Sequence, residues 1–131
     1  MIKRHTPNVT DAELRVLQAL WDQGPSTIRR LSEQIYPRGG PSYYATVQKL
    51  LERLEAEKCV ARDRSAMTHV FTAAVARDTF VGDQLRAMAE RLCGGSLAPL
   101  LTNLLKTETL SDENRKDLRR LLSSHRPPDG N

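Results

Sequence analysis

The sequence predicts a mainly α-helical fold that contains one small β-hairpin, and three observations lead to this expectation. Apolar residues recur at helical spacing along most of the chain. The spacing changes to a strand-like alternation only between residues 60 and 73. Aromatic residues make up only 5% of the 131 residues, so the core is expected to consist mostly of Leu, Val, Ile and Ala.

The first helix is expected in the segment "TDAELRVLQALWDQG", because both of its ends are marked. Thr10 is followed three residues later by Glu13, which is the spacing of a capping box. At the other end, Gly24 and Pro25 stop the helix. A shorter second helix is expected in "STIRRLSEQIY" with Ser26 as its cap, and the following "PRGGP" indicates a turn.

The third helix is expected from Ser42 to about Lys58, and it has two different faces. One face is apolar and suits a domain core. The other face is polar and basic, and the first ten residues of the helix contain no acidic side chain. The apolar face comprises Val47, Leu50, Leu51 and Leu54, whereas the polar face comprises Ser42, Thr46, Lys49 and Arg53 at spacings of 4, 3 and 4.

Two short strands are expected after this helix. The segments "VARDR" and "THVFTA" alternate or are rich in β-branched and aromatic residues, and "SAM" joins them into a hairpin. Arg62 and Arg64 should project from one side of the first strand, since alternate residues of a strand share a face.

The C-terminal part of the chain predicts three more helices. Residues 78–93 carry a heptad-like apolar seam, "SLAPLLTNLLKT" is a Leu-rich helix, and Ser111 caps the last one. Because three helices already fill a small domain, these apolar faces either pack into a monomeric extension or pair with a second chain. We expect a homodimer. The residues expected at its interface are Val81, Leu85, Met88, Leu92, Leu101 and Leu105.

Three helices followed by a hairpin are the elements of a winged helix-turn-helix, in which the helix after the turn lies in the DNA major groove. We expect a DNA-binding domain over residues 1–76 and a helical dimerisation domain over residues 77–131, with a disordered C-terminal tail. A two-fold dimer would read a palindrome. The residues expected to contact double-stranded DNA are Ser42, Tyr43, Tyr44, Thr46, Gln48, Lys49, Arg53, Arg62 and Arg64, with Arg29 and Arg30 as further backbone contacts.

Composition and motifs argue against several other functions. The net charge of +4 fits a nucleic-acid partner. The two cysteines match no metal-ligand spacing, no cofactor is expected, and no pattern of Ser, Cys and His indicates an enzyme. The N-terminus does not resemble a signal peptide, and no apolar run approaches the roughly 18 residues of a membrane span. A cytoplasmic protein without membrane insertion is therefore expected.

Two alternatives stay open at this point. The winged helix could be a protein-interaction module that never contacts DNA, in which case Lys49, Arg53 and Arg62 should be paired with acids and buried in the dimer. The protein could also be a regulator that senses a small molecule in a pocket between its halves.

The chain resembles the penicillinase and methicillin-resistance repressors of bacteria. The segments "TDAELRVLQALWDQGPSTIRRL", "YATVQKLLERLEAEKCV" and "VFTAAVARD" carry the resemblance, which extends over about residues 9–125. It implies a homodimeric repressor that binds dyad operators upstream of resistance genes. Thr46 and Lys49 fall where family members read bases, and Arg53 falls where an arginine supports the helix or the DNA backbone.

The resemblance also implies a membrane-bound sensor metalloprotease, which triggers cleavage of the dimerisation domain at an Asn that precedes an aromatic residue. The matching position is Asn103-Leu104, where leucine replaces the aromatic residue. Near the tip of the hairpin, family members often carry Gly-Arg, whereas this chain has Ala66-Met67. One expected phosphate contact is therefore missing.

Overall fold

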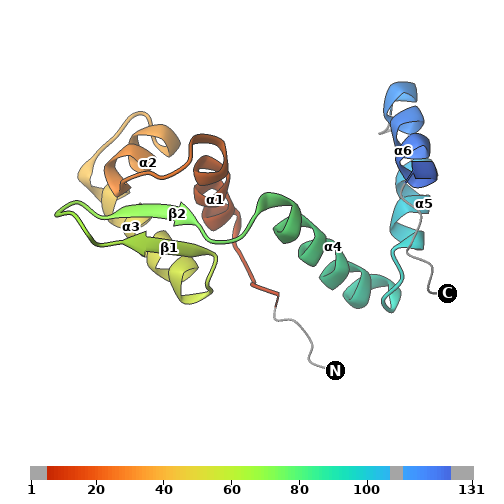
Figure 1. Ribbon diagram of the computed structural model, residues 1–131, viewed down its shortest axis with the longest axis horizontal. Coiled ribbons are helices and arrows are strands. Elements are labelled where there is room, and N and C mark those ends of the chain that lie inside the picture. Colours follow the sequence, from red (N-terminus) through yellow and green to blue (C-terminus); the bar gives the residue numbers. More distant parts are fainter. Residues whose placement is uncertain (1–5, 107–110, 125–131) are drawn as a thin grey trace. The chain divides into compact units, whose positions relative to one another are not determined.

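The computed structural model describes residues 6–106 and 111–124 (Figure 1). The mainly α-helical fold with one hairpin is confirmed. The C-terminal tail that the sequence predicts to be disordered lies outside the described residues. In chain order the elements are α1 (Asp11–Gln23), α2 (Ile28–Ile35), α3 (Pro41–Ala56), β1 (Val60–Asp63), β2 (Val70–Ala73), α4 (Arg77–Cys93), α5 (Ala98–Lys106) and α6 (Asp112–Ser124).

The chain divides into two compact units, and the boundary falls within α4, between Gln84 and Leu85. The first unit contains α1, α2, α3, the hairpin and the beginning of α4. Its core is largely aliphatic, as the low aromatic content indicates, with Phe71 and Phe80 as the aromatic members. The core side chains include Val16, Leu17, Leu20, Leu31, Val47, Leu51, Leu54, Val60, Phe71 and Phe80.

The hairpin is tied to the helices through the turn between α1 and α2. Strands β1 and β2 are antiparallel. The backbone N–H of Ser26 donates to the carbonyl oxygen of Phe71 at 3.0 Å, and the N–H of Phe71 donates to the carbonyl oxygen of Ser26 at 2.8 Å. Ser26 is thereby part of the sheet, so the expectation that it caps α2 was wrong. Thr27 is the cap, and its side chain accepts from the N–H of Arg30.

Other element ends depart slightly from expectation, and local chemistry explains them. The capping box of Thr10 and Glu13 is confirmed. Helix α3 ends at Ala56, before Lys58, because Lys58 has a φ of 64°, which a helix cannot continue. Strand β1 ends at Asp63, so Arg64 lies outside the strand in which it was expected.

The end of β1 is fixed by its last residue. The Asp63 carboxylate accepts the N–H of Ser65 at 2.9 Å, which is the geometry that starts a turn. This hydrogen bond lowers the pKa of Asp63 below its usual value. The turn between the strands consequently spans residues 64–69, longer than the "SAM" linker that the sequence indicates.

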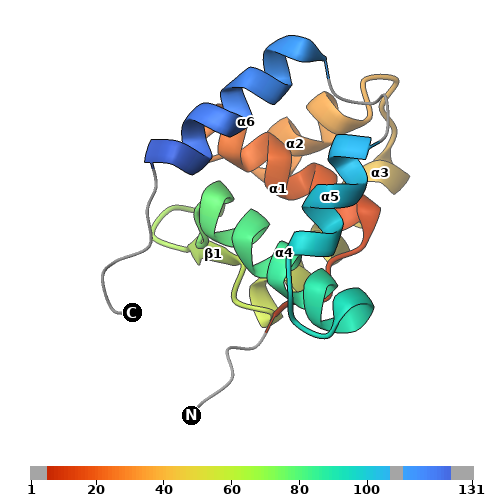
Figure 2. The same cartoon turned by 90° about the vertical axis from the view of Figure 1, so that its right-hand side faces the viewer.

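In the second unit, α5 and α6 (cyan and blue in Figure 2) have no buried residue among those described. Ser111 caps α6 as expected, because its hydroxyl accepts the N–H of Asn114 at 3.1 Å. Leu-rich faces of both helices line one apolar pocket, which includes Leu105 and Leu118. Among the helices that the structure describes, each is too short or too polar to cross a membrane.

Candidate nucleic-acid interface

The turn before α3 leaves the beginning of this helix open to an anion. Gly40 is the N-cap, makes no side-chain capping hydrogen bond, and is followed by Pro41 at the first helical position. Gly39 and Gly40 have φ values of 71° and 127°, which other residues adopt only with strain. The N–H groups of the first turn of α3 therefore lack a side-chain acceptor from the cap, and a helix N-terminus of this kind favours a phosphate oxygen.

The polar face of α3 is exposed over its first three turns. Ser42, Thr46, Gln48 and Lys49 all face solvent. The Thr46 hydroxyl donates to the carbonyl oxygen of Ser42 at 2.9 Å, so its oxygen still has lone pairs that can accept a hydrogen bond. Lys49 forms no ion pair with any acid in the described part of the chain. These side chains offer donors, acceptors and one uncompensated cation.

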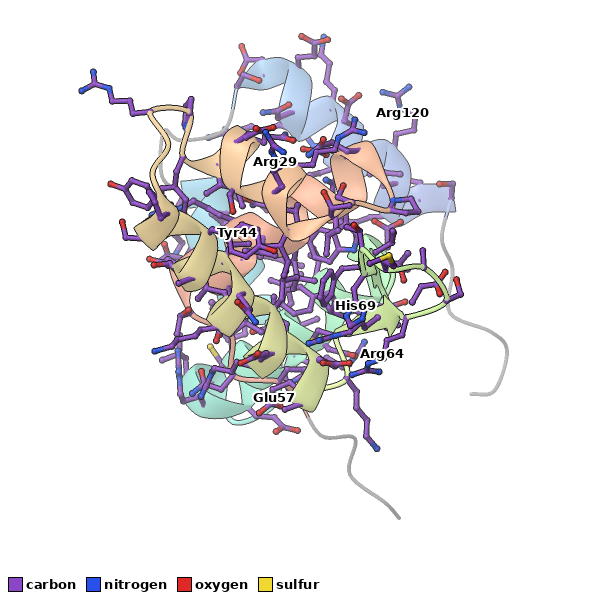
Figure 3. The ribbon with its side chains drawn as sticks, turned by 90° about the vertical axis from the view of Figure 1, so that its left-hand side faces the viewer. Arg29, Tyr44, Glu57, Arg64, His69 and Arg120 are labelled. Atoms are coloured by element: carbon purple, nitrogen blue, oxygen red, sulfur yellow. The ribbon has the colours of Figure 1, made fainter. Side chains whose placement is uncertain are left out.

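The two tyrosines at the beginning of α3 have different surroundings. The Tyr43 ring stacks on Tyr36, with centroids 4.3 Å apart and planes inclined by 12°. This contact joins the end of α2 to the start of α3. Tyr44 lies at the same end of α3, whereas Glu57 follows its other end (Figure 3). Both Tyr43 and Tyr44 are exposed enough to contact a ligand, and both line a pocket between α2 and α3.

Arg53 is an anchor of α3 as well as a surface cation. Its Nε lies 2.6 Å from Oε2 of Glu13, a carboxylate that is only 2% exposed. The other oxygen of Glu13 accepts the N–H of Thr10 at 2.9 Å. The acid of the α1 capping box therefore also binds the helix that carries the candidate interface. The Arg53 side chain is still 54% exposed, so part of it faces solvent.

The arginines of the hairpin are drawn towards the C-terminal half of α3. Arg62 donates to Glu55 at 2.9 Å and lies over the Phe71 ring, 4.8 Å from its centroid. Arg64 approaches the other oxygen of Glu55 at 3.6 Å. Arg62 is largely buried, whereas Arg64 is mostly exposed beside the end of α3 (Figure 3). Their predicted phosphate contacts stay a prediction, and for Arg62 such a contact would compete with Glu55.

The arginines of α2 are also engaged within the molecule. Arg29 pairs with Glu33 at 3.4 Å, and the Arg30 Nε donates to Gln23 at 3.0 Å, both on the surface. Exposed pairs of this kind are weak and can be exchanged for a phosphate at little cost.

Sequence reasoning missed three residues of this region. Arg38 lies in the turn before α3, is exposed, and makes no ion pair within the described residues. Its place just before the candidate helix was a signal that could have identified it. The roles of Glu13 and Glu55 as acceptors for Arg53 and Arg62 depend on contacts between elements, and no local spacing indicates them.

The predicted dimerisation residues are exposed in the single chain. Val81, Leu85, Met88 and Leu92 on α4 are each at least 40% exposed, and so are Leu101 and Leu105 on α5. The candidate cleavage residues Asn103 and Leu104 lie inside α5, where both are exposed. A protease would have to unwind this helix to bind them in extended form.

Comparison with known proteins gives one family match and several structural ones. The family model described as penicillinase repressor matches residues 9–124. A MarR family protein from Bacillus stearothermophilus is 23% identical, with 89% of this chain and 72% of that chain covered and a TM-score of 0.50. Two structures of ZitR variants from Lactococcus lactis are 16% and 17% identical, cover 94% and 87% of this chain and 77% and 78% of theirs, and have TM-scores of 0.46 and 0.43. No curated protein matches the chain.

At these identities the structural likeness concerns the fold alone, which is that of the winged-helix regulators. The family match is more informative, because it extends from the residue before the α1 cap to the end of α6. The family is one of repressors rather than enzymes. The chain therefore belongs to the penicillinase repressor family of transcriptional regulators.

Proposed function

We propose that the protein is a cytoplasmic repressor that binds palindromic operators as a homodimer, with α3 in the major groove. One observation carries the proposal: the face of α3 opposite its core contacts is exposed, acid-free over its first ten residues, and includes Lys49 without an ion-pair partner in the described chain. A protein-interaction module would be expected to pair this lysine. Arg53 and Arg62 are paired, but with acids of their own domain.

Each part of α3 suits a different class of DNA contact. Thr46, Gln48 and Lys49 lie where side chains of a recognition helix meet base edges, and they supply hydrogen-bond donors and acceptors. The uncapped helix N-terminus and Arg38 suit backbone phosphates, which position the helix without reading sequence. A dimer seated in this way would exclude polymerase from an overlapping promoter.

The homodimer is supported by the apolar residues of α4 and α5 that the single chain leaves exposed. Pairing Leu85 and Met88 with a second copy would remove this surface from water, at about 25 cal/mol for each Å² buried. The family supports operators near antibiotic-resistance genes and a sensor metalloprotease acting at Asn103-Leu104. Both are parts of the proposal that depend on genes outside this chain.

Replacing Lys49 with alanine should weaken binding to operator DNA by about 1–3 kcal/mol, since a base or phosphate contact of the major-groove helix is lost. Operator DNA is first obtained by selecting duplexes from a random-sequence pool with the wild-type protein. Affinity is then measured by fluorescence anisotropy on the selected duplex and on an unrelated one.

The matched control is Lys116→Ala, which removes one exposed lysine from α6 and leaves the same net charge. We expect this variant to keep the wild-type affinity. Equal affinities for the Lys49 and Lys116 variants would mean that α3 is not the reading helix. Failure of the wild-type protein to select any sequence would contradict the proposed function itself.

A further inference from the structure

The turn of the hairpin, residues 64–69, differs from what a phosphate-binding wing requires. Phosphate contacts come mainly from Arg and Lys. Here Arg64 is turned back to Glu55, and residues 65–68 read Ser-Ala-Met-Thr, without a charge. At the tip, Met67 is fully exposed, with a relative accessibility of 102%. An apolar side chain thus stands where a cation would be expected.

The tip is held in a defined place rather than hanging free of the domain. Strand β2 is bonded twice to Ser26, and Phe71 of the same strand is buried in the core. At the start of the turn, Asp63 binds the N–H of Ser65, and Arg62 joins β1 to α3 through Glu55. The hairpin is therefore fixed relative to α3, and whatever α3 binds lies at a set distance from Met67.

We propose that Met67 is an apolar contact residue for DNA: its side chain packs against deoxyribose and base edges of the minor groove next to the major-groove site of α3. This inference rests on the proposed function and adds a contact to it. Methionine is flexible and polarisable, and it is one of the apolar residues that proteins place against the minor groove. Ser65 and Thr68 on either side can hydrogen-bond to the acceptors that line that groove.

The proposal has a distinctive consequence for the salt dependence of binding. A cationic wing adds to affinity by releasing counterions, so its contribution falls steeply as salt rises. An apolar contact releases none, so its contribution is nearly independent of salt. Affinity lost on truncating Met67 should therefore be lost equally at low and high salt.

The test uses three variants of the full-length protein on its selected operator, with affinity measured across a range of KCl concentrations. Met67→Ala should bind about three- to tenfold more weakly at every concentration, because apolar contact area is lost. Its slope of log K against log salt should equal that of the wild type. Met67→Leu, which nearly conserves the volume, should bind like the wild type. Met67→Lys should steepen the slope by about one unit, as expected for one additional phosphate contact.

Three results would overturn the inference. Wild-type affinity of Met67→Ala on an operator that Lys49→Ala binds weakly would reject the wing contact and leave the proposed function intact. An unchanged slope for Met67→Lys would mean that the tip does not reach the DNA. A wild-type protein that selects no operator would remove both. Thermal unfolding of each variant should match the wild type, since Met67 makes no buried contact that could affect folding.

Discussion

Replacing Arg53 with alanine should lower the free energy of unfolding by about 2–4 kcal/mol, although half of this side chain faces solvent. The reason lies with its partner. Glu13 is almost completely buried, and Arg53 is the cation that the structure places against its carboxylate. Without the guanidinium, a buried negative charge is left with the Thr10 N–H and little else to stabilise it.

The measurement is urea unfolding followed by circular dichroism, with Lys49→Ala as the matched control. Lys49 is an exposed cation on the same helix, and its removal should change stability by less than about 0.5 kcal/mol. A double variant, Arg53→Ala with Glu13→Gln, should regain part of the lost stability, because the unpaired charge is gone. Equal stabilities of the Arg53 and Lys49 single variants would show that the Glu13 pair contributes nothing.

This result would also change how DNA-binding data on Arg53 are read. Weak operator binding by Arg53→Ala could come from a displaced α3 rather than from a lost DNA contact. Arg53→Lys separates the two effects, since lysine keeps the charge for Glu13 but lacks the planar fork of arginine. Unfolding and affinity therefore need to be measured on the same protein samples.

An aspartate in place of Met88 should convert the proposed dimer into monomers and weaken operator binding by about a hundredfold or more, because two linked half-site contacts become independent. Met88 is 40% exposed in the single chain, in the middle of the seam that runs along α4. In a dimer the new carboxylate would be buried without a partner.

Sedimentation velocity over a range of protein concentrations measures the association. Thr79→Asp is the matched control, since Thr79 is exposed on the opposite side of α4 from this seam, and the same charge there should leave the dimer intact. Two variants with the same sedimentation coefficient as the wild type would place the dimer interface elsewhere. A monomeric wild-type protein would reject the homodimer.

The elements that the sequence predicted well are those with local signals. The capping box at Thr10 and the apolar spacing of Val47, Leu51 and Leu54 depend on residues within one helix, and the structure reproduces both. Ser26 was assigned as a cap because its residue type favours that position. The pairing of its backbone with Phe71, far along the chain, took precedence, and Thr27 could cap in its place.

The arginines illustrate why a candidate site is harder to predict than a fold. Spacing alone placed Arg53 and Lys49 on one face and treated them alike. The structure separates them, because Glu13 comes from another helix and lies beside only one of them. Arg62 is likewise held by Glu55 across an element boundary. A helical wheel describes one helix, whereas ion pairs of this kind depend on how helices pack.

The most direct test of the account is recovery of DNA by the wild-type protein from its own genome at about 0.15 M salt, where nonspecific phosphate binding is weakened, followed by sequencing of the retained fragments. The account predicts a short motif with two-fold symmetry, whose half-sites are separated by about one helical turn or a multiple of it, upstream of a small number of genes. Retained fragments without a shared motif, from protein that is folded and dimeric, would contradict it.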